Sequence, residues 1–374
     1  MKPVDYQSGD SRQRLRLPMA RLMASLVFVA LILAVGCRGG GSTIHRQPHP
    51  DLHDEIIDAF LAAVDDGRYG NLHSTLIIID GDTVLEAYFD GHRADERAPL
   101  YSVTKSFLSA LIGLAIEDGS IPSDDAAIFV SFPEHQRLAV EDPRKLKITI
   151  GHLLSMTAGF QWDELSNPYD DRRNDYQRYL ASDDRIAFTL ALPLRNEPGR
   201  RVTYCSPLSQ ILSSLLTRAT GMTAAEYAQA RLFAPLGIDD WQWSAHDRHT
   251  SVGEAGLYLR PVDMAKLGQL FLQHGEWQGE QILPDAWVDA SVTSRGTANR
   301  WNDYGYSWWL YSNAAAKHHL DGHDDIYYAV GRGGQFVWVL PYANTVIACT
   351  GWNDSNGRWP ESMLWDFFLP AIDR

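Results

Sequence analysis

A serine and a lysine three residues apart, Ser102 and Lys105, open a helical pattern that runs to Glu117. Residues at positions i and i+3 lie on one face of a helix, so the hydroxyl and the amine can meet. The N–H groups and the positive dipole end of a helix N-terminus favour a developing anion. The same field, together with desolvation, favours the neutral amine that can act as a base. The pair predicts a nucleophile and its base, although the four-residue pattern by itself is more often a helix N-cap followed by a surface lysine.

Two further segments add to this pair. Tyr204 lies in a loop before another helical pattern, where its hydroxyl could shuttle protons between nucleophile and leaving group. Glycines between Gly331 and Gly334 interrupt two strand-like segments and allow a substrate to approach the backbone. An N–H near Gln335 could then be an oxyanion donor beside the N–H of Ser102. The alternatives are a half-buried core tyrosine and a simple hairpin turn.

The surrounding segments predict a sheet built from both ends of the chain, with a helical domain inserted between them. Residues 73–79 and 83–89 are β-branched runs on either side of an Asp-Gly-Asp turn, which predicts a hairpin. Further strand patterns lie at residues 305–311, 326–330, 335–340 and 345–350. Apolar residues at helical spacing occupy residues 54–64, 102–117, 148–156, 209–220, 224–232, 261–274 and 362–372. We predict an α/β (α+β) fold with an α/β part at about 54–120 and 290–374 and a helical part at about 121–289.

Composition excludes several classes of protein. The 374 residues are 45% hydrophobic, which excludes disorder over the whole length. Three cysteines exclude a disulfide framework; Cys205 and Cys349 could pair after export, and small buried thiols are the alternative. A net charge of −14 argues against nucleic acid as a partner. Beyond the N-terminus there is no 20-residue apolar run, which excludes a polytopic membrane protein.

The N-terminus has the order of an export signal with a lipobox. A basic patch precedes a short apolar stretch at residues 22–35, and Cys37 follows Gly36. We expect residues 1–36 to be removed, Cys37 to take a lipid, and residues 37–53 to form a tether. Because Arg38 rather than an aspartate follows the cysteine, we expect the periplasmic face of an outer membrane, assuming a Gram-negative cell. The alternative is an uncleaved anchor helix with Cys37 as a bystander.

Several blocks of the chain resemble one family. The segment 101–106 reads YSVTKS, the segment 148–159 reads ITIGHLLSMTAG, and the segment 256–268 joins GLYL to DMAKLG. Together with the loop at Tyr204, they resemble the serine β-lactamase and DD-peptidase superfamily. The resemblance extends over about residues 55–370 and is greatest to the class C-like branch, which includes family VIII esterases and 6-aminohexanoate-dimer hydrolases.

The resemblance implies roles for the residues named above. Ser102 would be the acylated nucleophile and Lys105 its general base, while Tyr204 would assist acylation and activate the deacylating water. The third motif would correspond to the Gly331–Gln335 stretch, with Gly333, Gly334 and Gln335 near the oxyanion site. The implied fold is an antiparallel sheet flanked by helices, plus a helical domain, with the site in the cleft between them. No metal or cofactor is implied.

Two departures from the family bear on the substrate. Ser206 replaces the usual asparagine of the tyrosine motif, an amide that contacts the acyl side of lactams, and Arg332-Gly333 stands in place of Lys-Thr. These departures favour a small ester or amide substrate over lactams. The alternatives are a β-lactamase or DD-peptidase, and a lipoprotein that only binds. The sequence does not indicate an oligomeric state.

Several aromatic and acidic residues could act either in substrate binding or in the structure alone. Trp162, Tyr169, Trp308 and Trp309 could line a substrate cleft, with burial in the core as the alternative. Asp163 and Glu164 could bind a cationic group of a substrate, or be solvated loop charges. Residues 317–325 are rich in His and Asp and are predicted to be a solvated hairpin loop rather than a metal site. The absence of G-x-S-x-G excludes the α/β-hydrolase route to a serine enzyme.

Overall fold

The computed structural model describes residues 41–320, 322–353 and 361–372. The predicted signal segment 1–36 and Cys37 lie outside these ranges. Within them, none of the helices combines the length and the apolar character that a membrane crossing needs.

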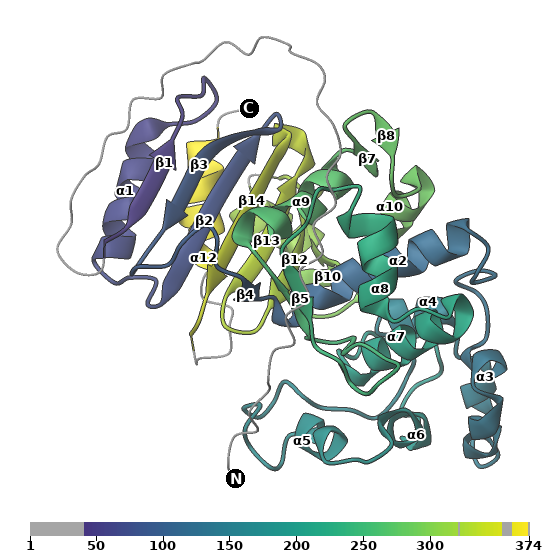
Figure 1. Cartoon of the computed structure of the whole chain (residues 1–374). Coiled ribbons are helices and arrows are strands. Elements are labelled where there is room, and N and C mark those ends of the chain that lie inside the picture. Colours follow the sequence, from purple (N-terminus) through teal and green to yellow (C-terminus); the bar gives the residue numbers. More distant parts are fainter. Residues whose placement is uncertain (1–40, 321, 354–360, 373–374) are drawn as a thin grey trace, which may run out of the picture. The chain divides into compact units, whose positions relative to one another are not determined.

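A nine-stranded sheet organises the fold. Its strands are β1 (Thr43–Arg46), β2 (Leu72–Ile79), β3 (Asp82–Tyr88), β9 (Gly296–Thr297), β10 (Asn302–Tyr304), β11 (Trp309–Tyr311), β12 (Tyr327–Gly331), β13 (Gln335–Leu340) and β14 (Thr345–Gly351). The strand order is β1-β3-β2-β14-β13-β12-β11-β10-β9, and every neighbouring pair is antiparallel. At the centre β2 pairs with β14, so the first and last parts of the described chain meet in one sheet (Figure 1). The predicted fold, a sheet built from both ends of the chain, is confirmed.

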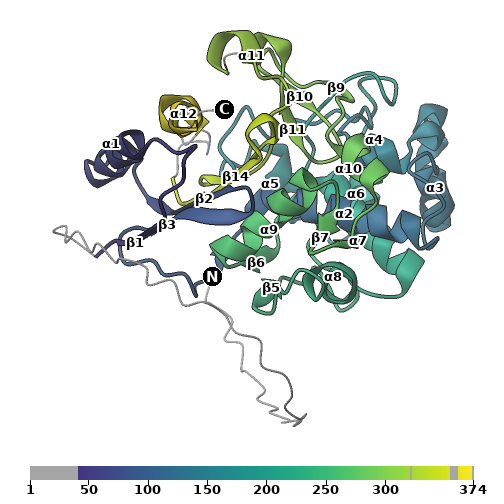
Figure 2. The same cartoon turned by 90° about the horizontal axis from the view of Figure 1, so that it is seen from above.

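Helices flank this sheet. The α-helices are α1 (Asp54–Asp65), α2 (Thr104–Glu117), α3 (Ile128–Ser131), α4 (Ile150–Leu154), α5 (Asp175–Leu180), α6 (Arg185–Ala191), α7 (Pro207–Thr220), α8 (Ala224–Ala228), α9 (Pro261–Leu272), α10 (Asp285–Ser291), α11 (Asn313–His319), α12 (Glu361–Met363) and α13 (Leu369–Ala371). Short 3₁₀ segments are η1 (Tyr101–Val103), η2 (Pro133–Ala139), η3 (Pro143–Lys147) and η5 (Pro341–Ala343), and π-helical turns are η4 (Gln229–Phe233) and η6 (Leu364–Phe368). The view from above shows α1 and α12 on one side of the sheet and α9 on the other (Figure 2).

The middle of the chain is largely helical, as predicted, but not entirely. It contributes β5 (Trp241–Trp243) and β6 (Leu257–Leu259), which form a small sheet with β4 (Ala98–Pro99), and a hairpin of β7 (Glu276–Trp277) and β8 (Glu280–Gln281). Helix α9, which the sequence placed in the helical part, instead packs on β13 and β14. Its apolar face therefore covers the large sheet.

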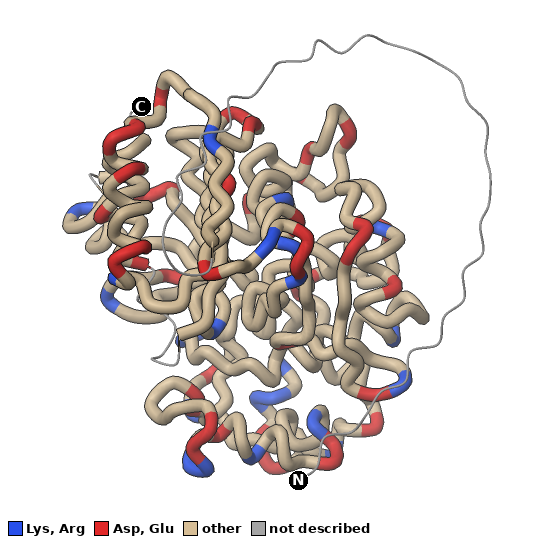
Figure 3. The backbone as a smooth tube through the Cα atoms, turned by 60° about the vertical axis from the view of Figure 1, so that its left-hand side comes forward, with Lys and Arg blue, Asp and Glu red and all other residues tan. Residues whose placement is uncertain are grey.

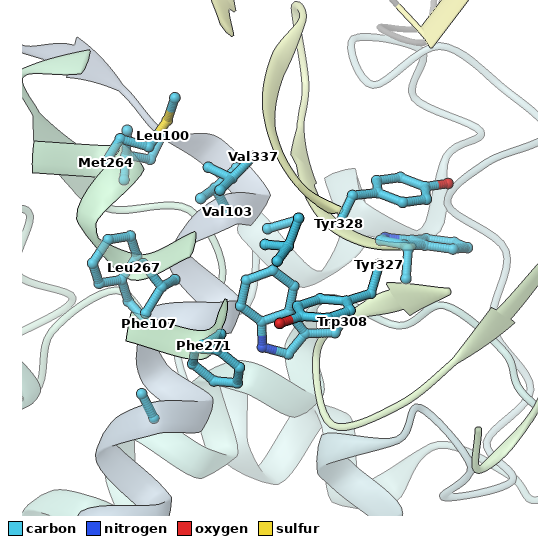
Figure 4. Packing of buried hydrophobic residues seen from close by; sticks show 14 of the residues in the cluster. Leu100, Val103, Phe107, Met264, Leu267, Phe271, Trp308, Tyr327, Tyr328 and Val337 are labelled. Carbon is cyan, nitrogen blue, oxygen red and sulfur yellow. The ribbon is translucent and has the colours of Figure 1, made fainter. Parts of the chain in front are cut away.

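Helix α2 lies inside the protein rather than on its surface. Every residue from Thr104 to Ala115 is buried, so this part of the helix has no face exposed to solvent. Figure 4 shows Val103 and Phe107, at the start of this helix, among side chains of α9 such as Leu267 and Phe271 and of the sheet such as Val337. The ring of Phe271 lies 4.6 Å from that of Trp308, centroid to centroid. Burying each such side chain stabilises the fold by roughly 1.5–3 kcal/mol, so the start of α2 has a firmly held position.

Two local predictions were wrong. Thr43–Arg46, predicted as part of a tether, is the edge strand β1 and pairs with β3. Residues 317–319, predicted to lie in a hairpin loop, instead end helix α11, and the ring of His319 stacks on Trp365 at 5.1 Å. Residues 317–319 are exposed, as a solvated segment should be, but they are helical, and β1 is ordered by its pairing with β3.

Acidic residues are spread over the protein, whereas the two described thiols are buried. The net charge is −14, and Figure 3 shows acidic positions along the whole described tube, in both the sheet and the helical part. Cys205 and Cys349 are buried free thiols, and burial raises the pKa of each above its ordinary value.

Candidate active site

Ser102 and Lys105 meet at the start of α2. Ser102 lies in the 3₁₀ turn η1, and Lys105 lies in the first turn of the helix that follows. Lys105 Nζ donates a hydrogen bond to Ser102 Oγ at 2.8 Å and another to the backbone oxygen of Glu254 at 2.9 Å. The lysine side chain is buried, and in the described part of the chain it forms no ion pair with a carboxylate. A buried amine that contacts a hydroxyl can act as a base when it is neutral, and the buried Glu254 carboxylate lies near enough to interact with its charge.

The residue before the nucleophile has a strained backbone. Tyr101 has φ of 47°, in the left-handed region that non-glycine residues seldom adopt. Such a conformation costs about 1–3 kcal/mol and persists only where the surroundings impose it. Here the ring of Tyr101 lies against Trp352, with centroids 5.3 Å apart. The sharp turn places Ser102 at the N-terminal end of a helix that is otherwise enclosed.

Tyr204 approaches this pair from the helical part. It lies in the loop before α7, and its ring centroid is 5.1 Å from Lys105 Nζ. The ring stacks on Trp309 at 5.6 Å and meets Tyr304 edge-on at 6.2 Å. Its hydroxyl makes no hydrogen bond to any described residue, so it is free to exchange a proton with a bound molecule.

The Gly331–Gln335 turn joins β12 to β13 and lies against the segment that leads into Ser102. An ideal Cβ on Gly331 would come within 2.3 Å of the backbone oxygen of Leu100, so only glycine fits there. The turn then needs φ of 90° at Gly333, and Gly334 also has a positive φ. The glycines therefore allow the backbone of this turn to lie directly against the segment that leads into Ser102.

The Gln335 side chain holds the turn in place, whereas the sequence analysis concerned a backbone N–H near this residue. Its amide is buried, donates to the backbone oxygens of Arg332 and Gly351 at 2.9 and 2.8 Å, and accepts from the Gly351 N–H at 3.1 Å. The side chain thus fastens the turn to the end of β14. The Arg332 guanidinium lies 5.2 Å from the ring centroid of Tyr169.

Ser206 and Trp162, predicted to contact substrate, are both turned toward Glu164. The Ser206 Oγ donates to Glu164 at 2.6 Å, and the Trp162 Nε1 donates to it at 2.7 Å. Both side chains are buried. Glu164 is only 1% exposed, so it is neither a solvated loop charge nor a free ligand for a cationic substrate. Asp163 instead accepts from the N–H groups of the next loop residues, Leu165 and Ser166.

A small hollow of about 210 Å³ opens beside Tyr204. Its lining comes from the loops at 160–165, 195–196 and 201–204, and includes Trp162. Ligand sites for drug-sized molecules are usually larger, at about 300–1,000 Å³, so this hollow suits a small group. Of the other aromatic residues considered, Trp308 is in the core and Trp309 supports the ring of Tyr204.

The site residues do not form a metal centre. In the described ranges, two groups bring three potential ligands together: His49 with Asp51 and Asp80, and His274 with Asp285 and Asp289. Both groups consist of exposed or half-buried side chains, an arrangement that is common without an ion. Neither includes a residue of the site at Ser102.

Comparison with known proteins gives consistent results. A family model described as β-lactamase matches residues 64–351. The 6-aminohexanoate-dimer hydrolase of Paenarthrobacter ureafaciens is 24% identical over 307 residues, which are 75% of this chain and 73% of that protein.

Solved structures with a similar fold include a family VIII carboxylesterase. It has a TM-score of 0.65 and 17% identity, over 88% of this chain and 99% of the other. An octameric penicillin-binding protein homologue from Pyrococcus abyssi has a TM-score of 0.64 and 18% identity, over 85% and 77% of the two chains. At these identities, the likeness shows a common fold.

Proposed function

This chain belongs to the β-lactamase family, and from that premise we propose that it cleaves an ester or amide bond through an acyl-enzyme on Ser102. It is a β-lactamase-fold serine hydrolase related to esterases and amidases. The observation that carries the proposed mechanism is the 2.8 Å contact between Lys105 Nζ and Ser102 Oγ. A nucleophile and a base at hydrogen-bond distance are what covalent catalysis requires.

Acylation begins when Ser102 Oγ attacks the carbonyl carbon and its proton passes to Lys105. The new C–O bond leaves a negative charge on the carbonyl oxygen. The N–H of Ser102 and an N–H of the Gly331–Gln335 turn stabilise that charge. The tetrahedral intermediate then collapses, the bond to the leaving group breaks, and the leaving group takes a proton through Tyr204.

Deacylation reverses the roles of these groups. A water attacks the acyl carbon of the ester on Ser102 and gives its proton to Tyr204, whose own proton passes through Lys105 to Ser102 Oγ as the acyl C–O bond breaks. The free hydroxyl of Tyr204 and its place beside Lys105 support this role. The products are a carboxylic acid and an alcohol or amine.

The surroundings of the site support a small ester or amide substrate rather than a lactam. The Ser206 hydroxyl, which stands where the family has an amide for lactams, already donates to Glu164. Gly333 offers no hydroxyl at the third motif. A short acyl group depends mainly on the nucleophile and the oxyanion donors.

Replacement of the nucleophile tests the proposal. Ser102→Ala should lower kcat for p-nitrophenyl acetate by ~10⁴ or more, because members of a catalytic unit act together. Ser109→Ala is a matched control on the same helix, since the Ser109 Oγ is buried and has no hydrogen-bond partner. Its kcat should equal that of the wild type. Wild-type turnover by Ser102→Ala would refute the mechanism.

We also propose export and lipid anchoring through Cys37, on the basis of the N-terminal sequence alone. Cys37→Ser should leave an unprocessed precursor or a protein in the wrong fraction, as seen by gel mobility and membrane fractionation. Processing and localisation like those of the wild type would show that the lipobox interpretation is wrong.

A further inference from the structure

The carboxylate of Glu164 is held by four donors. Ser206 donates both its N–H, at 2.8 Å, and its Oγ–H, at 2.6 Å. The Trp162 Nε1–H donates at 2.7 Å and the Tyr169 hydroxyl at 2.9 Å. An ionised carboxylate has about four acceptor sites, so all are in use. Since Glu164 is 1% exposed, protein groups rather than water satisfy it.

The bond to the Ser206 N–H is one of three that hold the loop carrying Tyr204. The Thr203 N–H donates to the backbone oxygen of Met156 at 2.8 Å, and the Cys205 N–H contacts the Met156 sulfur at 3.4 Å. Together these bonds fix the backbone on both sides of Tyr204. The Tyr204 hydroxyl itself has no hydrogen bond among the described residues, so its location depends on the backbone of this loop and on the contacts of its ring with Trp309 and Tyr304.

We infer that Glu164 is a positioning residue for Tyr204, an inference that rests on the proposed function of Tyr204 in proton transfer. Glu164 bonds to neither Ser102 nor Lys105, so it acts through the loop. Without its carboxylate, the Ser206 N–H and the Trp162 Nε1–H would be buried with no acceptor. The loop would move to find one, and a displacement of about 1 Å in a catalytic group can cost ~10²-fold in rate.

Two substitutions separate geometry from charge. Glu164→Ala removes all four acceptor contacts. Glu164→Gln keeps an oxygen for the Ser206 N–H and the Trp162 Nε1–H if its amide nitrogen takes the other position. There it faces only the hydroxyls of Ser206 and Tyr169, which can rotate and accept. We expect Glu164→Ala to lower kcat by about 10- to 100-fold with little change in KM, and Glu164→Gln to remain within about threefold of wild type.

A double-mutant cycle with Tyr204→Phe tests whether Glu164 acts through Tyr204. Activity of the full-length protein toward p-nitrophenyl acetate is measured for Glu164→Ala, Tyr204→Phe and the double variant, with the Tm of each. If Glu164 acts through Tyr204, the double variant should be no slower than Tyr204→Phe. A double variant whose loss is the product of the two single losses would overturn the inference, because a general structural defect behaves in that way.

Further outcomes distinguish this inference from the proposed function. An impaired Tyr204→Phe with a fully active Glu164→Ala overturns the inference alone. A fully active Tyr204→Phe overturns the role of Tyr204 and the inference with it. If Glu164→Ala does not fold, Glu164→Met has nearly the same volume without the acceptors and is judged in the same way.

A control for loss of stability comes from helix α9. Asp263 is also a fully buried carboxylate near a helix N-terminus, and it accepts from the Arg260 Nε at 2.6 Å. It contacts no residue of the site, so Asp263→Asn should lower the Tm and leave kcat unchanged. An equal loss of kcat in Asp263→Asn and Glu164→Ala would overturn the inference.

Discussion

Addition of one methyl group at Gly331 should disable the site by separating two segments of its backbone. The ideal Cβ would lie 2.3 Å from the backbone oxygen of Leu100, whereas real Cβ atoms essentially never approach another atom within 3.0 Å. The turn after β12 and the segment before Ser102 must therefore separate by at least 0.7 Å, the difference between these distances. Both move as backbone, so no side-chain rotation relieves the contact. A displacement of this size between nucleophile and oxyanion donors should lower kcat/KM by about 10- to 100-fold.

The assay compares Gly331→Ala with Gly268→Ala. Gly268 lies in α9, where an added Cβ would meet the methyl groups of Val337 and Val346 at 2.7 and 2.8 Å. Overpacking of this kind costs about 1–3 kcal/mol of stability without reaching the site. We expect both variants to have a lowered Tm in thermal unfolding, and only Gly331→Ala to lose hydrolysis of p-nitrophenyl acetate. Wild-type kcat/KM in a folded Gly331→Ala would refute the argument that this contact sets the geometry at Ser102.

Three more results are expected. Short-chain p-nitrophenyl esters should be hydrolysed, and a chromogenic cephalosporin should be turned over weakly or not at all. The reason is that each hydrogen bond lost from lactam recognition costs ~1–3 kcal/mol. Efficient cephalosporin hydrolysis with inert esters would favour the lactamase alternative. Burial, and then the neighbouring His92, lower the pKa of His73 to about 4. The contribution of neutral His73 to stability is therefore fully present above the unfolded pKa near 6.5 and is lost as the pH falls toward 4. His73→Gln should make Tm decline less steeply between pH 6.5 and 4. A decline of Tm as steep as that of the wild type would contradict this prediction. Burial raises the pKa of Glu254 in the folded protein. The contribution of the protonated carboxyl to folding stability is therefore present below its ordinary pKa and is lost as the pH rises through its raised pKa. Glu254→Gln, in which the group stays neutral, should gain Tm relative to wild type as the pH rises above 4.5, the ordinary pKa of this carboxyl, and a difference in Tm that does not change with pH would count against it.

Much of the fold could be predicted because it depends on local patterns. The β-branched runs around Asp80–Asp82 predict a hairpin, and β2 and β3 form one. Gly221 follows a helical pattern, and it takes the left-handed conformation that ends α7. The polar segment at β1 gave no such pattern, because an edge strand with a half-exposed face is ordered by its partner strand rather than by its own sequence.

The sequence by itself determined which groups could react and that two of them could meet. Ser102 and Lys105 are three residues apart on a helix, so their contact follows from helical geometry. The tertiary structure alone decided where the other groups lie. Whether Glu164 is solvated or buried depends on Ser206, which is 42 residues away in the chain, and the need for glycine at position 331 depends on Leu100. A side chain's type sets its chemistry, but its environment comes from segments that only folding brings together.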